Sequence, residues 1–182
     1  MPSIYLVRHG KAAAGFGDHL DPGLDDLGWQ QAEKAADQLS ALTPMALYSS
    51  PLARARETAI PLARRWEVTP TIEPRVAEIP SPTTDLQERS IWLRQVMQER
   101  WSNLPQALNQ WRQNLIDCLL DLPDDSIVFC HFIAINVAVG HARGEDQMIV
   151  FRPDNASITR FSTDSGKLEL RQLGQEADTR VN

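Results

Sequence analysis

The sequence predicts an α/β fold, a three-layer α/β/α sandwich in which helices cover both faces of a mostly parallel, mixed central sheet. Short apolar runs alternate with longer segments of helical periodicity along most of the chain, which is the pattern of βαβ units. Two late apolar runs are separated only by a short turn, so the last strands are expected to form a hairpin-like pair. The 182 residues suit one domain with a sizeable core.

Five elements are predicted in the first part of the chain. Strands are expected at 3–7, 45–48 and 68–72, and helices at 27–42 and from 49–51 to about residue 66. Asp25 or Asp26 can cap the first of these helices, because a carboxylate accepts hydrogen bonds from the unpaired N–H groups of the first turn. The second helix opens with Ser-Ser-Pro, in which proline suits the first helical position and Ser49 or Ser50 can act as the cap.

The remainder of the chain predicts an irregular segment followed by the rest of the sheet. Three prolines between residues 73 and 82 indicate extended, irregular chain. Helices are expected at 86–97, 105–122 and 132–142, and strands at 126–130, 156–162 and 167–173. The Asp-Ser-Gly turn at 164–166 joins the last two strands.

Polar side chains follow three of the predicted strands directly. Arg8 and His9 follow the first strand, Ser49 and Ser50 follow the second, and His131 follows a later one. The carboxyl ends of parallel strands lie at one edge of an α/β sheet, where ligands bind. We therefore expect these side chains to meet in one site.

The residue types at this edge indicate binding of a phosphoryl group. A guanidinium presents paired donors that match phosphate oxygens, and Arg8 and Arg54 supply two of them, with Arg54 near the positive end of the second helix. One histidine nitrogen can form a covalent intermediate, and a second histidine, if protonated, can donate to an oxygen that gains charge. The sequence has neither a Walker A motif nor an obvious metal cage, so the arginines are expected to do the work that Mg²⁺ does elsewhere.

Composition narrows the function classes further. The net charge is −6, which argues against a broad nucleic-acid-binding face, and no apolar run approaches the roughly 20 residues of a membrane span. No secretory signal is evident, and we expect a cytoplasmic protein in which Cys118 and Cys130 are buried, reduced thiols. The acidic residues between 18 and 26 match no metal motif, and helix capping accounts for the later ones. We expect neither a metal nor another cofactor.

Five further features occur in a defined order. Residues 6–10 read LVRHG, 24–32 read LDDLGWQQA, 49–59 read SSPLARARETA, His131 follows a strand, and 155–159 read NASIT. Together they resemble the signatures of the histidine phosphatase superfamily, also called the phosphoglycerate mutase-like superfamily. The resemblance spans about residues 4–161 and implies a single histidine-phosphatase-like domain over 1–182.

The resemblance assigns roles to individual residues. His9 would be the nucleophile that becomes phosphohistidine. Arg8 and Arg54 would hold the phosphoryl oxygens, and His131 would complete the phosphate pocket and stabilise the transferring group. The family's acidic proton donor follows the third strand, where the similar sequence VAEI makes Glu78 the candidate. A leaving alkoxide needs a proton, and a carboxylic acid of raised pKa can supply it.

Departures from the family pattern bear on the substrate. Phe132 stands where the family commonly has glycine after its second histidine. Lys11 replaces the glutamate that the mutases and several phosphatases carry at that position, which argues against a phosphoglycerate mutase. Pro-Ser-Pro at 80–82 replaces a segment often found beyond the acid. The segment 73–125 is expected to form a small lid insertion, and substrate choice is expected to lie there.

Three functions follow from these observations. The leading one is a metal-independent phosphatase that hydrolyses a small phosphomonoester through phosphohistidine on His9. The compact length and Lys11 resemble the small phosphohistidine phosphatases, so a phosphoprotein is the alternative substrate. The third is a non-catalytic phosphate-binding module, which the departure at Phe132 motivates.

Overall fold

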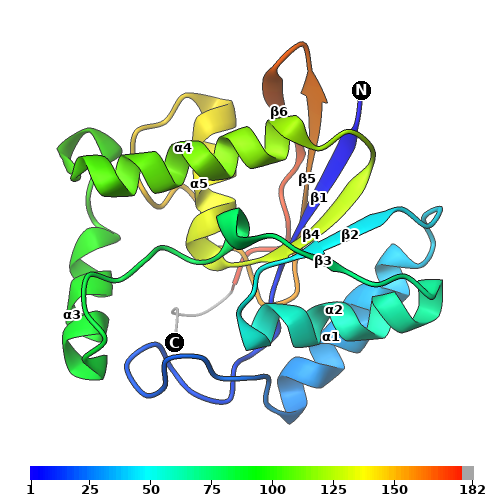
Figure 1. Ribbon diagram of the computed structural model, residues 1–182, viewed down its shortest axis with the longest axis horizontal. Coiled ribbons are helices and arrows are strands. Elements are labelled where there is room, and N and C mark those ends of the chain that lie inside the picture. The colour runs from blue at the N-terminus through cyan, green and yellow to red at the C-terminus, as the bar shows by residue number, and fades with distance from the viewer. Residues whose placement is uncertain (178–182) are drawn as a thin grey trace.

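The computed structural model describes residues 1–177 and confirms the predicted α/β class (Figure 1). The strands are β1 (Ser3–Arg8), β2 (Ala46–Ser49), β3 (Thr71–Ile72), β4 (Ser126–Cys130), β5 (Ile158–Asp164) and β6 (Lys167–Gln172). The helices are α1 (Asp26–Leu39), α2 (Ala53–Trp66), α3 (Leu86–Val96), α4 (Gln106–Asp121) and α5 (Phe132–Arg143), with short 3₁₀ turns η1 (Pro74–Val76) and η2 (Trp101–Asn103). None of the helices within residues 1–177 is long and apolar enough to cross a membrane.

The strands form one sheet in the order β3-β2-β4-β1-β5-β6. The first four strands in this order are parallel, whereas β5 pairs antiparallel with β1 and β6 pairs antiparallel with β5. The predicted turn of the last hairpin is confirmed, with Ser165 and Gly166 at positive φ values of 51° and 77°, as two-residue hairpin turns require. The parallel pairing brings the carboxyl ends of β1, β2 and β4 to one edge of the sheet.

Side chains alternate along the central strands and enter two different cores. Val7, Ile127 and Phe129 face α1 and α2 on one side of the sheet, whereas Leu6 and Val128 belong to a larger core with α4 and α5 on the other. Figure 1 shows the two pairs of helices on opposite faces. The alternation follows from the two-residue period of a strand, and it buries both faces of the strands that lead into the site.

The start of α2 differs from the prediction. The helix begins at Ala53 after the N-cap residue Leu52, so Pro51 is not its first residue, and no side chain of the cap residue makes the capping bond. The predicted serine cap was therefore wrong. Asp21, distant in sequence, accepts from the N–H of Ala53 at 2.8 Å, while Ser50 accepts from the N–H of Leu52, the residue before the helix. The prediction that Asp25 or Asp26 caps α1 is confirmed for Asp25, which accepts from the N–H of Gly28 at 2.7 Å.

Two strand boundaries also differ from the prediction. The third strand contains only Thr71 and Ile72, and β5 begins at Ile158 instead of residue 156. Ala156 has a positive φ of 58°, which no strand residue adopts, so the chain must turn before β5 can begin.

The segment 73–125 contains two helices with different surroundings. Helix α4 packs into the larger core through Leu115 and Leu119, whereas α3 stands apart from the sheet in Figure 1. Leu93 in α3 and Met97 at the C-terminal end of this helix are only partly buried against that core. Of this segment, α3 is therefore the element that lies beside the three layers and not within them.

Two glycines hold the exit of β1 against α1. Gly10 follows the strand and Gly28 lies in the first turn of α1, and a Cβ added to Gly10 would lie 2.5 Å from the carbonyl oxygen of Gly28. A Cβ on Gly28 would lie even closer to the carbonyl oxygen of Lys11. Because both obstacles are backbone atoms, only glycine permits this approach, and the contact fixes the segment that carries His9.

We expect Gly28→Ala to lower the free energy of unfolding by roughly 1–3 kcal/mol, because the added methyl group overpacks a backbone contact. Gly140→Ala in α5 is the matched control. Its Cβ would come no closer than 3.4 Å to another atom, and alanine favours a helix by up to about 1 kcal/mol, so this variant should be as stable as the wild type or more stable. Urea unfolding of the three proteins measures both effects, and equal midpoints for the wild type and Gly28→Ala would contradict the prediction.

Candidate active site

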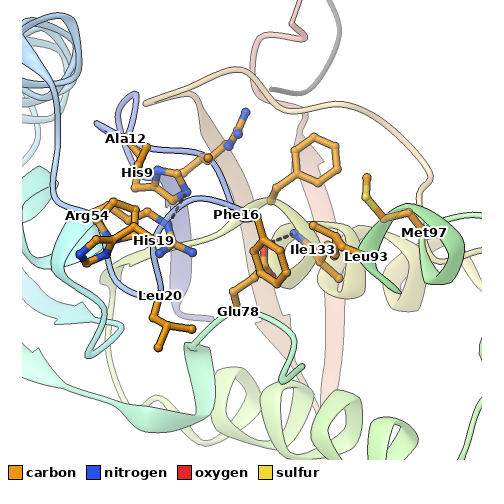
Figure 2. A pocket seen from close by; sticks show the side chains of 15 residues that line it. His9, Ala12, Phe16, His19, Leu20, Arg54, Glu78, Leu93, Met97 and Ile133 are labelled. Carbon is orange, nitrogen blue, oxygen red and sulfur yellow. Dashed lines mark hydrogen bonds between the residues drawn. The ribbon is translucent and has the colours of Figure 1, made fainter. Parts of the chain in front are cut away.

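A pocket lies at the carboxyl end of β1 and is lined by four of the five predicted site residues (Figure 2). Arg8 ends β1, His9 follows it, Arg54 lies in the first turn of α2, and Glu78 follows η1. His131, directly after β4, is fully buried, and its ring centroid is 5.2 Å from that of His9. The cavity holds about 100 Å³, less than the roughly 300–1,000 Å³ of clefts for drug-sized ligands, so it suits a small ligand.

His9 is held in one tautomer. Its Nδ1 lies 2.7 Å from the carbonyl oxygen of Gly10, and because a carbonyl only accepts, Nδ1 carries the proton and Nε2 carries the lone pair. The Nε–H of Arg54 donates to this Nε2 over 3.2 Å, as a dashed line in Figure 2 marks. The arrangement places a nucleophilic nitrogen directly beside a group that binds anions.

The backbone of His9 is fixed from two sides. Its N–H donates to the carbonyl of Cys130 in β4 at 3.1 Å. Its carbonyl accepts from the side-chain amide of Asn155 at 3.2 Å and from the N–H of Ala156 at 3.3 Å. The NASIT stretch therefore holds the main-chain carbonyl of His9 and brings the segment before β5 to the site.

Ser50 is a site residue whose role the sequence did not reveal. Its Oγ accepts from the N–H of Leu52 at 3.2 Å and lies 2.8 Å from Nε2 of His131. The hydroxyl proton can therefore be donated to Nε2, which leaves the proton of the ring on Nδ1. This Nδ1 is buried and has no hydrogen-bond partner within residues 1–177, so a donor remains for an anion. The only sequence signal was a serine at the same sheet edge as the histidines.

Both histidines are neutral at pH 7. Burial lowers the pKa of His9 well below 6.5, and the positive charges of Arg54 and Arg8 lower it further. Burial also lowers the pKa of His131 well below 6.5, and the charge of Arg54 is again the largest electrostatic contribution. Each effect disfavours the imidazolium form. In the tautomer that carries its proton on Nδ1, neutral His131 can donate from that nitrogen, so a protonated second histidine is not needed for donation.

The guanidinium of Arg8 is held by a hydrogen bond and by contact with an aromatic ring. Its Nη1 donates to the carbonyl of Pro153 at 2.9 Å, and its guanidinium lies 5.1 Å from the ring centroid of Phe132. Burial lowers the pKa of Arg8 to about 10, so the group stays charged at neutral pH. Phe132, the departure from the family pattern, thus lines the pocket while it packs against the arginine, a contact that favours the cation.

Glu78 lies at the N-terminus of α5. Its carboxyl oxygens accept from the N–H groups of Ile133 at 3.1 Å, Ala134 at 3.2 Å and Ile79 at 3.1 Å. These donors and the positive end of the helix favour the carboxylate, but burial outweighs them and raises the pKa of Glu78. A carboxyl group of raised pKa in the wall of the pocket is suited to give and to accept a proton.

Apart from His19, the remaining wall of the pocket is apolar and comes from residues that were not predicted as site residues (Figure 2). Phe16 and Leu20 belong to the loop between β1 and α1, and Leu93 and Met97 come from α3 and its C-terminal end (Figure 2). Nothing in their spacing marks these residues, since only the fold brings the loop and the helix to the same cavity. No group of three or more metal-binding side chains gathers within residues 1–177.

A model of the histidine phosphatase superfamily (branch 1) matches residues 4–176. The chain belongs to this superfamily. The match extends over nearly the whole sequence and includes β1, both histidines and the NASIT stretch, so the resemblance seen in the motifs is confirmed.

Named relatives share this family at low identity. A glucosyl-3-phosphoglycerate phosphatase of Mycolicibacterium vanbaalenii is 28% identical over 157 residues, which cover 81% of this chain and 66% of that protein. Phosphoserine phosphatase 1 of Hydrogenobacter thermophilus is 28% identical over 115 residues, which cover 61% of this chain and 51% of that protein. The chain thus spans less than two thirds of the length of these curated relatives.

The fold is also shared with solved structures. The crystal structure of a phosphoserine phosphatase from Entamoeba histolytica in complex with 3-phosphoglyceric acid aligns with a TM-score of 0.74 at 22% identity, covering 98% of each chain. This agreement confirms the mixed sheet and its flanking helices over nearly the whole chain.

We expect His9 to remain uncharged in an NMR pH titration well below pH 6.5. Arg54→Gln removes a positive charge and the donor to Nε2, so the pKa of His9 should rise toward 6.5 in that variant. Arg64→Gln removes an exposed arginine from the same helix and should leave the titration unchanged. Because the unfolded chain protonates near pH 6.5, the stability that neutral His9 contributes is complete above this pH and is lost below it. A wild-type His9 that titrates near 6.5 would contradict the assignment.

Proposed function

We propose that this protein is a phosphatase that hydrolyses small phosphomonoesters through a phosphohistidine on His9. One observation carries the proposal: the Nε2 lone pair of a neutral His9 lies beside the Arg54 guanidinium in a pocket that Arg8 and Glu78 also line. The pocket therefore joins a nucleophile, two anion-binding cations and a proton donor. The names of the relatives, both phosphatases, support the same reaction class.

In the first step, Nε2 of His9 attacks phosphorus and the bond from phosphorus to the ester oxygen breaks. Arg8 and Arg54 bind the non-bridging oxygens. When Arg54 turns from Nε2 of His9 to a phosphoryl oxygen, it releases the lone pair that attacks. The carbonyl of Gly10 on Nδ1 stabilises the positive charge that the ring gains, and Nδ1 of His131 donates to an oxygen of the transferring group.

Glu78 completes the proton balance in both steps. The protonated carboxyl group gives its proton to the leaving alkoxide, which departs as an alcohol. In the second step the resulting carboxylate accepts a proton from water, the water oxygen attacks phosphorus, and the bond from phosphorus to Nε2 breaks. Inorganic phosphate leaves and His9 is restored. The two guanidiniums supply the positive charge that the transition state needs, so we propose that the reaction is independent of metal.

We expect the wild type to release phosphate from p-nitrophenyl phosphate in the presence of EDTA, and His9→Ala to abolish this release. A brief incubation followed by denaturation in alkali should trap one phosphoryl group on His9, detected by mass spectrometry as an acid-labile adduct. His141→Ala removes an exposed histidine at the end of α5 and should retain full activity. Undiminished release by His9→Ala would refute the mechanism, and phosphate binding without hydrolysis of any ester would identify a binding module.

The replacement of the usual glutamate by Lys11 keeps protein phosphohistidine as a second candidate substrate. The substitution Glu78→Gln separates it from an alkyl ester. An alkoxide is a poor leaving group without a proton, so kcat on an alkyl phosphate should fall about 100-fold, whereas an imidazole leaving group depends less on Glu78.

We expect the alkyl ester to be the better wild-type substrate and the more sensitive one to Glu78→Gln. Glu99→Gln, at an exposed glutamate after α3, should change neither rate. The measurements are kcat and KM for glycerol 3-phosphate and for a phosphohistidine peptide. A higher kcat/KM on the peptide, unaffected by Glu78→Gln, would favour the phosphoprotein substrate instead.

A further inference from the structure

Arg8 is a partly buried cation without an acidic partner. It makes no ion pair within residues 1–177. Glu78 and Asp154 are the acidic groups whose charges act on its pKa, but both carboxyl groups accept from backbone N–H groups. Glu78 binds the start of α5, and Asp154 accepts from the N–H of Asn155 at 2.8 Å. The guanidinium of Arg8 must therefore be held by other means.

The ring of Phe132 covers one face of this guanidinium. The guanidinium carbon lies over the ring, 5.1 Å from its centroid, which is within the roughly 6 Å over which a ring attracts a cation. Phe132 is only 5% exposed and lines the pocket together with Arg8. Because the ring contacts the face of the guanidinium, it occupies none of the N–H groups at the edge.

The edge of the guanidinium thereby stays available for an anion. Nη1 of Arg8 donates to the carbonyl of Pro153 at 2.9 Å, and Nε is buried without a hydrogen-bond partner in the part of the chain that the structure describes. A carboxylate partner would take two N–H donors and neutralise the charge. The contact with Phe132 instead holds the cation and leaves its charge and its remaining donors for a ligand.

The ring itself is held in place at the start of α5. Phe132 is the first residue of this helix and directly follows His131. Its carbonyl accepts from the side-chain amide of Asn136 at 3.0 Å, and Glu78 binds the next two N–H groups of the helix. The same turn of the chain therefore places the second imidazole of the site and the ring that faces Arg8.

We infer that Phe132 is a positioning residue for phosphate binding: its ring takes the place of an acidic partner and holds Arg8 in the orientation that meets the phosphoryl oxygens. The inference rests on the proposed function, because the anion that Arg8 meets is the phosphoryl group that His9 attacks. Arg8 binds this group both before and during the transfer, so loss of the ring acts on KM more than on kcat.

Inorganic phosphate is the probe, and its dissociation constant is measured by calorimetry or, for weak variants, by ³¹P NMR titration. Phe132→Leu keeps an apolar side chain but removes the face of the ring, so we expect phosphate binding to weaken about tenfold, the size of a desolvated cation–π contact. Phe132→Tyr keeps the ring and should bind phosphate within about twofold of the wild type. On p-nitrophenyl phosphate, Phe132→Leu should raise KM about tenfold and change kcat less than about threefold.

A double-mutant cycle shows whether the ring acts through Arg8. In an Arg8→Gln background, Phe132→Leu should weaken phosphate binding by less than about twofold, because the cation that the ring holds is gone. Phe161→Leu is the matched control, since it truncates another buried ring of the same core. This control should lower the free energy of unfolding but leave the phosphate affinity within about twofold of the wild type.

Four results would each overturn the inference. In the first, Phe132→Leu leaves the phosphate affinity unchanged. In the second, it weakens binding by the same factor with and without Arg8. In the third, Phe161→Leu weakens binding as much as Phe132→Leu does, so that only core packing is involved. In the fourth, Phe132→Tyr binds phosphate as weakly as Phe132→Leu, although the ring is retained.

The binding measurements also separate this inference from the proposed function. Phosphate binding that depends on Phe132 only in the presence of Arg8, without hydrolysis of any ester, would refute the phosphatase and retain the positioning role. Hydrolysis through His9 with a phosphate affinity that Phe132→Leu does not change would retain the phosphatase and refute the positioning role.

Discussion

The site depends on two imidazoles that stay neutral because they are buried among guanidiniums. Burial and the charges of Arg54 and Arg8 lower the pKa of His9, and only the neutral ring has a lone pair on Nε2. The same burial lowers the pKa of both arginines, while the nearby acidic groups Glu78, Asp154 and Asp21 act in the opposite direction and favour their charged form. The positive charges that keep His9 unprotonated are the same ones that would attract an anion to the pocket.

Hydrogen bonds between distant parts of the chain hold these charged side chains in place. The N–H of Gly10 donates to Oγ1 of Thr58 at 3.0 Å, and Thr58 donates to the carbonyl of Arg54 at 2.7 Å. Gly10, the residue after His9, is thus tied to the first turn of α2, from which Arg54 donates to His9. The close approach of Gly10 and Gly28 presses the same segment against α1. Backbone geometry therefore explains why the motifs contain Gly10, Gly28 and Thr58. These residues fix the position of the segment that carries His9.

Local patterns in the sequence were sufficient for the elements and for the residues that follow them. The apolar run before Arg8 and the one before His131 predicted strands, and parallel pairing then placed both histidines at one edge. The role of Ser50 was not predictable, because its partner His131 lies 81 residues away and a serine before a proline is also a good helix cap. The actual acceptor at the start of α2, Asp21, lies in an irregular loop whose path no periodicity reveals. Long-range polar pairings of this kind are decided by tertiary structure.

The site residues that follow the strands and the wall residues that come from α3 occupy different parts of the fold. Arg8, His9 and His131 stand at or directly after buried strands, so the two cores on either side of the sheet fix them. Leu93 and Met97, which line the pocket, instead come from α3 and its C-terminal end, outside the three layers. A substitution of Leu93 or Met97 can therefore reshape the wall of the pocket without moving the strands that hold Arg8 and His9. The sheet therefore fixes the residues proposed for the reaction, and α3 supplies part of the wall beside them.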